Sequence, residues 1–128
     1  MKVYSYAYNT DYLPAMPFAE VELNRVGDSS TLQKLSVLVD SGADITMIPL
    51  KILRQIRAQY IGEARLRGVL ERGQYIELYL VQLTLGPHHF RGLRVAAIPG
   101  DEAILGRDVL NRLEVTLNGL ASMVEIHE

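Results

Sequence analysis

The chain contains no cysteine, which excludes disulfide bonds, thiolate nucleophiles and metal sites with cysteine ligands, and is compatible with a reducing compartment. It also lacks a strong charge of one sign. Its formal net charge is −2, and its 13 Lys and Arg residues are scattered among 15 Asp and Glu residues. Because nucleic acids and anionic membrane surfaces attract clustered positive charge, neither is an expected partner.

Long hydrophobic runs are absent as well. The longest apolar stretch, Ile76–Leu85, is interrupted by Glu77, Gln82 and Thr84, and the first nine residues hold no continuous apolar segment. A membrane-spanning helix needs about 20 mostly apolar residues, and a secretory signal needs an apolar core. The sequence therefore predicts a soluble, cytoplasmic protein.

The composition that remains is that of a globular protein. Among 128 residues, 48% are apolar and 22% are charged, which is far from the signature of disorder. This length supports one modest hydrophobic core and is too short for two. We therefore expect residues 1–128 to form a single domain.

Turn residues recur along the chain, and the segments between them have the patterns of short strands. Phe18–Arg25 alternates apolar and polar residues, as a half-buried strand does. Leu35–Val39 and Gln74–Leu85 are richer in Val, Leu and Tyr, which is typical of strands buried on both faces. Tyr4, Tyr6 and Tyr8 also alternate, and we interpret them as an edge strand or a dimer contact.

Two segments have helical spacing. Pro49–Arg57 opens with a proline, which suits a first helical turn, and Arg107–Arg112 predicts another turn or two. Near the C-terminus, Asn118-Gly119 is a strong signal for a two-residue hairpin between the strands Leu113–Leu117 and Leu120–Ile126. The sequence thus predicts an all-β fold with one or two short helices.

The most informative stretch is an apolar strand, Val37–Val39, that runs directly into Asp40. Burial penalises a charged carboxylate, so such a residue must be hydrogen-bonded, paired or partly protonated. Gly42 allows a sharp turn and a close approach of backbone N–H groups to the carboxylate, and Ser41 adds a hydroxyl that can fix the loop. This pattern makes Asp40 the leading candidate for a catalytic acid.

These residues resemble those of a known family. Asp40-Ser41-Gly42-Ala43 is similar to the Asp-Thr/Ser-Gly-Ala signature of aspartic proteases, and Ile104–Leu110 is similar to the apolar-apolar-Gly-Arg-Asn/Asp-x-Leu segment of their retropepsin branch. Each motif follows an apolar run, and the ordered pair is more specific than either motif alone. The resemblance covers roughly residues 15 to 126. It implies a closed, mostly antiparallel acid-protease β-barrel that forms a homodimer.

The resemblance also implies a role for each matched residue. Asp40 matches the catalytic aspartate. The active-site loop is matched by Ser41, Gly42 and Ala43. Asp44 matches an acid that contacts the substrate backbone and forms a structural ion pair with the arginine at the position of Arg107. Asp108 stands where retroviral enzymes often have asparagine, which leaves its hydrogen bonding open.

A flap is expected in Gly68–Gly73, between the strands Glu63–Arg67 and Gln74–Leu85. Glycines at both ends would let a hairpin tip open and close over a substrate. The acidic and basic residues at the tip differ from the glycine-rich flaps of retroviral enzymes. The substrate-binding residues expected here are Gly68, Val69 and Leu70.

The function implied by the resemblance is that of an aspartic endopeptidase. Two adjacent carboxylates share one proton, so that one acts as a base toward water and the other as an acid toward the peptide carbonyl. Because each chain carries one signature, a monomer holds half a site and a homodimer is required. The expected partner is a polypeptide substrate, with no cofactor and no metal. The alternative is a catalytically silent module of the same fold that dimerises or binds an extended peptide.

Some of these residues, and two histidines, have simpler interpretations. Asp40 could cap an ordinary turn, since Asp-Ser-Gly is common turn chemistry. The adjacent His88 and His89 would point to opposite sides of a strand and have no third ligand nearby, so they predict no metal site, and we expect them in a turn after Gly86-Pro87.

Overall fold

The computed structural model describes residues 1–66 and 74–128, and within them strands predominate over two short helices. The all-β prediction is therefore confirmed. In chain order the elements are β1 (Val3–Ala7), β2 (Phe18–Arg25), β3 (Asp28–Val39), β4 (Met47–Pro49), α1 (Leu50–Gln55), β5 (Gln59–Leu66), β6 (Gln74–Leu85), β7 (His88–Ile98), β8 (Ala103–Leu105), α2 (Arg107–Leu110), β9 (Val115–Asn118) and β10 (Met123–His127).

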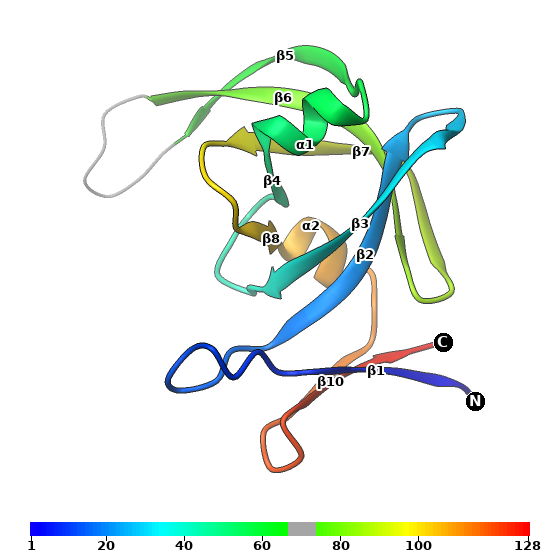
Figure 1. The fold of residues 1–128 in the computed structure, drawn as a ribbon, viewed down its shortest axis with the longest axis vertical. Helices are drawn as coiled ribbons and strands as arrows, with labels where there is room; N and C mark the ends of the chain where they lie inside the picture. Colours follow the sequence, from blue (N-terminus) through cyan, green and yellow to red (C-terminus); the bar gives the residue numbers. More distant parts are fainter. Residues whose placement is uncertain (67–73) are drawn as a thin grey trace.

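Strands close into a barrel in the upper part of the molecule (Figure 1). The order around the ring is β2-β3-β8-β4-β7-β6, and β6 pairs back onto β2 through Leu23 and Leu83. Strand β5 extends the sheet beyond β6. The β3–β8 and β4–β7 pairings are parallel and the others are antiparallel, so the predicted closed, mostly antiparallel barrel is confirmed.

The barrel interior is filled by alternate side chains. Ala19, Val21 and Leu23 of β2 are buried, as the alternation predicted. In β6 the prediction of burial on both faces is wrong: Leu83 and Leu85 are buried, while Thr84 between them is only partly covered. The outer face of the barrel meets solvent at this strand, so only inward-facing side chains are removed from water. The end of β3 differs, because Val37, Leu38 and Val39 are all buried.

A separate three-stranded sheet, ordered β1-β10-β9, lies below the barrel (Figure 1). Strand β1 is one edge of this sheet, which confirms the edge-strand interpretation of Tyr4 and Tyr6. The Tyr4 ring packs on Gly86, where an added Cβ would lie 3.1 Å from Tyr4 Cγ. The buried side chains of Val124 and Ile126 in the central strand complete the contact with the barrel core.

The hairpin between β9 and β10 differs from the prediction. Its turn has four residues, 119–122, and pairs Asn118 with Met123, so the returning strand begins at Met123 rather than Leu120. A two-residue type I′ turn requires positive φ at both Asn118 and Gly119. Positive φ occurs at Ser122 instead, and the Asn118 side chain accepts a hydrogen bond from the backbone N–H of Ala121 at 3.0 Å. This side-chain contact favours the longer turn.

Both predicted helices are present. Helix α1 begins directly after Pro49 and packs Leu53 into the core, and α2 follows Gly106 and buries Val109. Neither they nor any other helix within the described ranges is long and apolar enough to cross a membrane.

Candidate active site

The position of Asp40 is fixed by the strand that precedes it. Strand β3 pairs in parallel with β8, and the pairing of Val39 with Leu105 is the last of this ladder. The backbone N–H of Asp40 then donates to the carbonyl of Leu105 at 3.0 Å, and that of Val39 donates to the carbonyl of Pro17 at 2.9 Å. Asp40 therefore directly follows a buried strand end that is hydrogen-bonded on both sides, and Asp40 is itself partly buried.

The turn after Asp40 folds back on its carboxylate. The N–H of Gly42 donates to Asp40 Oδ1 at 2.9 Å, and a Cβ on Gly42 would lie 3.1 Å from the same oxygen. The predicted close approach of a glycine N–H is thus present in the geometry. Among the hydrogen bonds within residues 1–66 and 74–128, this is the one that the Asp40 carboxylate accepts, and it is made to Oδ1.

Arg107, in the second motif (Ile104–Leu110), is hydrogen-bonded to the active-site loop that follows Asp40. Its guanidinium donates to the carbonyl of Ser41 at 2.7 Å and forms an ion pair with Asp44, while its backbone N–H donates to the carbonyl of Ala43 at 2.8 Å. The two predicted ion-pair partners are therefore in contact. Since the Asp44 side chain is 87% exposed, the pair orders the loop more than it stabilises the fold.

Behind the loop lies a buried hydrogen-bond network that the sequence analysis did not find. The hydroxyl of Thr46 donates to Asp108 Oδ1 at 2.8 Å, and its backbone N–H donates to Asp108 Oδ2 at 3.0 Å. The same hydroxyl accepts a hydrogen bond from the N–H of Gly106 at 3.1 Å. Thr46 is fully buried, so this network joins the two motifs inside the protein. In the sequence, the signal for this network is the polar Thr46 inside the apolar run from Ile45 to Ile48.

Gly106 allows the two motifs to pack closely. A Cβ at this position would lie 2.7 Å from the carbonyl carbon of Ile45 and 3.0 Å from the carbonyl oxygen of Ala43. These are backbone atoms, which cannot move aside as a flexible side chain could. Only glycine fits between the second motif and the active-site loop.

A cleft of about 590 Å³ begins at the active-site loop and extends toward the β5–β6 hairpin. Its inner wall is mainly apolar, as is usual for sites that take a peptide or small molecule. It is lined by Gly42, Ala43, Asp44, Ile45 and Met47 from the loop and β4, and by Ala64, Arg65 and Ile76 from β5 and β6. The predicted flap residues Gly68, Val69 and Leu70 lie outside the described residues.

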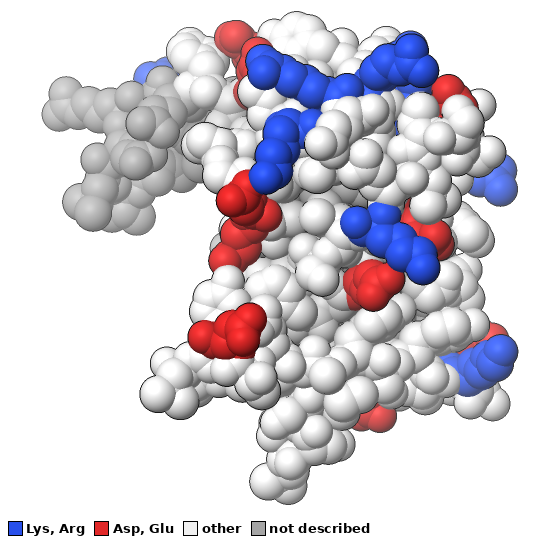
Figure 2. Space-filling model, viewed as in Figure 1, with Lys and Arg blue, Asp and Glu red and all other residues white. Residues whose placement is uncertain are grey.

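Charge is not evenly spread over the face shown in Figure 2: most Lys and Arg side chains lie over its upper half, and most Asp and Glu side chains lie at its left and in its middle and lower part. The two signs nevertheless nearly balance over the whole sequence, whose formal net charge is −2.

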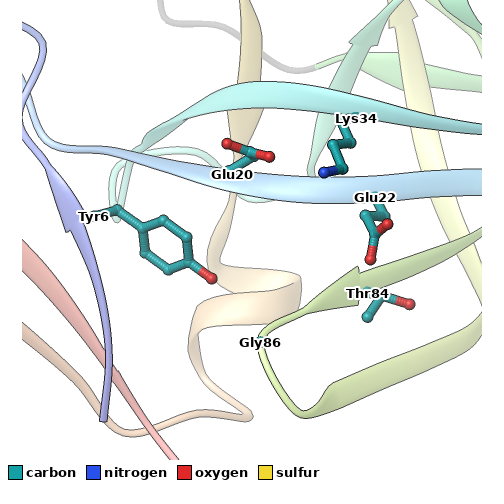
Figure 3. Close-up of a pocket in the computed structure, with 6 residues that line it drawn as sticks. All are labelled: Tyr6, Glu20, Glu22, Lys34, Thr84 and Gly86. Carbon is teal, nitrogen blue, oxygen red and sulfur yellow. The ribbon is translucent and has the colours of Figure 1, made fainter.

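A second pocket, of about 270 Å³, lies between β1 and the barrel (Figure 3). The Tyr6 ring points into it, Glu20 and Glu22 line it from β2, and Lys34 lines it from β3, where it is the register partner of Glu22. Burial raises the pKa of the Tyr6 phenol, and the negative charge of Glu20 raises this pKa further. The phenol therefore stays protonated, and the carboxylates of Glu20 and Glu22 share this pocket with the ammonium group of Lys34.

The two adjacent histidines begin β7, so the expectation that they lie in a turn is wrong. His88 Nε2 contacts the carbonyl of His127 at 2.8 Å, and His89 Nδ1 contacts the hydroxyl of Thr84 at 3.2 Å. The described part of the chain contains no group of three His, Cys, Asp or Glu residues arranged to hold a metal ion.

The fold is that of the retropepsin-like aspartic proteases, and similar solved structures agree. A retropepsin-like aspartic protease from Rickettsia conorii is 15% identical with a TM-score of 0.61, covering 98% of this chain and 91% of its own. The EIAV protease in complex with the inhibitor HBY-793 is 24% identical with a TM-score of 0.52, covering 84% and 93%. The retroviral protease-like domain of Ddi1 from Leishmania major is 17% identical with a TM-score of 0.55, covering 88% and 89%. At these identities the likeness shows the fold.

The family follows from the sequence itself. The model of the gag-polyprotein putative aspartyl protease family matches residues 31–112, which is more than half of the chain and includes both motifs. The chain therefore belongs to this family. No curated protein gives a significant match to the chain.

Proposed function

We propose that this protein is an aspartic endopeptidase whose catalytic site is completed when two copies bring their Asp40 residues together. The observation that carries the proposal is the position and hydrogen bonding of the Asp40 carboxylate. It lies at the end of a buried strand, and its intrachain hydrogen bond comes from the N–H of Gly42. Within the described residues its other oxygen accepts no hydrogen bond, and that oxygen could meet a partner outside its own chain.

The chemistry follows from placing two such carboxylates in contact. Two like charges at close range cannot both ionise readily, so the pair holds one proton. The ionised Asp40 removes a proton from a water molecule, whose oxygen bonds to the peptide carbonyl carbon. Asp40 of the partner subunit donates its proton to the carbonyl oxygen. The tetrahedral intermediate then breaks its C–N bond as the nitrogen takes up a proton, which gives a carboxylic acid and an amine.

The proposed substrate is an extended polypeptide bound in the cleft beside the loop. Backbone hydrogen bonds would hold it, with Asp44 among the contacts and the apolar wall from Ile45 to Ile76 accepting side chains. The predicted contacts from Gly68, Val69 and Leu70 belong to this proposal. The single-domain organisation and the cytoplasmic location remain predictions from the sequence.

The test is Asp40→Asn, which keeps the shape of the side chain and removes the acid. We expect cleavage of an unstructured protein to fall by at least about 10³-fold, because neither general acid nor general base catalysis remains. The far-UV circular dichroism and the unfolding temperature should stay unchanged. The matched control is Asp101→Asn, which alters only an exposed ion pair with Lys51 and should cleave normally.

Two results would contradict the proposal. Full activity in Asp40→Asn would exclude this carboxylate from the reaction. A wild-type protein that binds extended peptides and cleaves none of them between acidic and neutral pH would favour the silent binding module.

A further inference from the structure

The sulfur chemistry of this chain is confined to its methionines. It has four of them and no cysteine, so the thioether is the sulfur group that an oxidant can attack. Oxidation to a sulfoxide turns a flexible apolar side chain into a polar one. Met1 is 98% exposed, and Met16, Met47 and Met123 are partly buried. Of the four, Met47 lines the cleft beside the active-site loop.

The backbone around Met47 fixes the direction of its side chain. Met47 begins β4, where it pairs with Ala96 of β7 and Ile104 of β8. Its neighbours Thr46 and Ile48 are both fully buried. Because successive side chains of a strand point to opposite faces, Met47 points away from the core that holds these neighbours and into the cleft.

The side chains that share the cleft with Met47 are mostly small or apolar. Ala43 and Ile45 precede it at alternate positions, and Ala64 and Ile76 line the cleft from the β5–β6 hairpin. None of these four side chains carries a hydrogen-bond donor. A sulfoxide oxygen among them would be desolvated when an apolar side chain of a substrate binds, and burying an unpaired polar group costs free energy.

A guanidinium also lines the cleft, that of Arg65. Arg65 is the register partner of Tyr75, whereas Ala64 is the partner of Ile76. Strand alternation therefore directs the Arg65 side chain to the face of the hairpin opposite Ala64 and Ile76. It does not offer its donors to the apolar part of the cleft that Met47 faces.

An oxidant has a route to the Met47 sulfur. Met47 is partly exposed, and the cleft beside it has a volume of about 590 Å³. This is many times the roughly 30 Å³ that one water molecule occupies in the liquid. Hydrogen peroxide is little larger than water, so it can enter the cleft and approach the thioether.

We infer that Met47 is an oxidation site through which a peroxide weakens substrate binding in the cleft. The sulfur lone pair bonds to one peroxide oxygen, the O–O bond breaks, and the other oxygen leaves as water after taking up a proton. The sulfur thus loses two electrons and the peroxide gains them. The effect on cleavage rests on the proposed function, whereas the oxidation of Met47 does not.

The experiment treats the wild-type protein with hydrogen peroxide, removes the peroxide and locates the added oxygen by peptide mass mapping. We expect sulfoxide at Met47 and a kcat/KM for casein about tenfold lower, because a polar oxygen would line the apolar cleft. The loss should lie mainly in KM, since Met47 lies beside the substrate and not at the reacting atoms. Methionine sulfoxide reductases for both epimers should restore the activity, and the unfolding temperature should stay unchanged.

The matched variants are Met47→Leu and Met123→Leu, each compared with its own untreated sample. Leucine is similar in volume to methionine and has no sulfur to oxidise. After peroxide, Met47→Leu should keep the kcat/KM of its untreated sample, although its other methionines are oxidised. Met123 lies in β10 and does not line the cleft, so Met123→Leu should lose activity as wild type does.

Three results would overturn the inference and leave the protease proposal standing. The first is a Met47 that stays reduced while Met16 and Met123 are oxidised. The second is an equal loss of activity in treated wild type and treated Met47→Leu. The third is a fall in unfolding temperature that accompanies the loss, which would place the effect in the fold. A wild-type protein that cleaves nothing before treatment would instead overturn the protease proposal, and the mass map would still decide whether Met47 is oxidised.

Discussion

Asp40 directly follows β3, and Asp108 lies in α2 shortly after β8, the strand that pairs in parallel with β3, yet their carboxylates have different surroundings. Within the described residues, the Asp40 carboxylate accepts one hydrogen bond, from Gly42 of its own turn. The Asp108 carboxylate accepts three, from the backbone N–H and hydroxyl of Thr46 and from the N–H of Val109. The acids of the two motifs thus differ in how far their oxygens are occupied by donors of the same chain.

This difference in hydrogen bonding separates a carboxylate that can bind another molecule from one that holds the protein together. A carboxylate whose oxygens are occupied by buried donors holds the surrounding backbone together, because losing it would leave those donors unsatisfied. A carboxylate with a free oxygen can bind water or a second acid. Asp108 stabilises the backbone behind the loop that carries Asp40.

The substitution Asp108→Ala is the strongest test of the structural role that this comparison assigns to Asp108. Thr46 and Val109 would lose their acceptor, and Thr46 is fully buried, so we expect the free energy of unfolding to fall by about 3 kcal/mol. Urea denaturation of the pure variant measures this loss. Asp101→Ala is the control and should cost less than about 1 kcal/mol, because its ion pair with Lys51 is exposed. Equal losses in the two variants would refute the structural role of Asp108.

Gly106→Ala tests the close packing of the two motifs without touching a carboxylate. The added Cβ would press on the carbonyl group of Ile45, and we expect a loss of about 2 kcal/mol in unfolding free energy. The control is Gly119→Ala, where no atom lies within 4 Å of the added Cβ. Denaturation curves that match for both alanine variants would show that the contact at Gly106 is not restrictive.

The smallest expected effect is that of Asp44→Asn. It removes an exposed ion pair with Arg107, whose guanidinium keeps its hydrogen bond to the Ser41 carbonyl at 2.7 Å. We expect thermal unfolding to show a loss of about 0.5 kcal/mol at low salt. The difference from wild type should vanish in 1 M salt, where exposed charges are screened. A larger loss that persists in high salt would mean that the pair is part of the buried frame.

Much of the site could be predicted from the sequence because its signals are local. The step from Val39 into Asp40, the glycine two residues later and the Gly106-Arg107 pair of the second motif all lie within short stretches. The network of Thr46 with Asp108 could not be predicted in this way, because its partners are 62 residues apart and each is an ordinary polar residue in its own segment. Its existence depends on how β4 and α2 are packed.

The C-terminal hairpin shows the same limit at a smaller scale. Asn118-Gly119 favours a two-residue turn by its own backbone preferences. In the observed four-residue turn, the backbone N–H of Ala121 donates a hydrogen bond to the Asn118 side chain. A second hydrogen bond, from the N–H of Tyr8 to the carbonyl of Ser122, joins the turn to the start of the chain. Contacts with a distant segment outweighed a local preference that is small in energy.

The sequence by itself determined the β character of this protein, the position of its candidate acid at the end of an apolar strand, and its membership of the aspartyl protease family. Alternation and turn chemistry are properties of neighbouring residues, so they can be read along the chain. Tertiary structure alone decided that β6 closes the barrel onto β2 and that the Asp108 carboxylate accepts hydrogen bonds from buried donors. These features depend on which segments meet in space, and burial and hydrogen-bond satisfaction act only between groups that the fold has brought together.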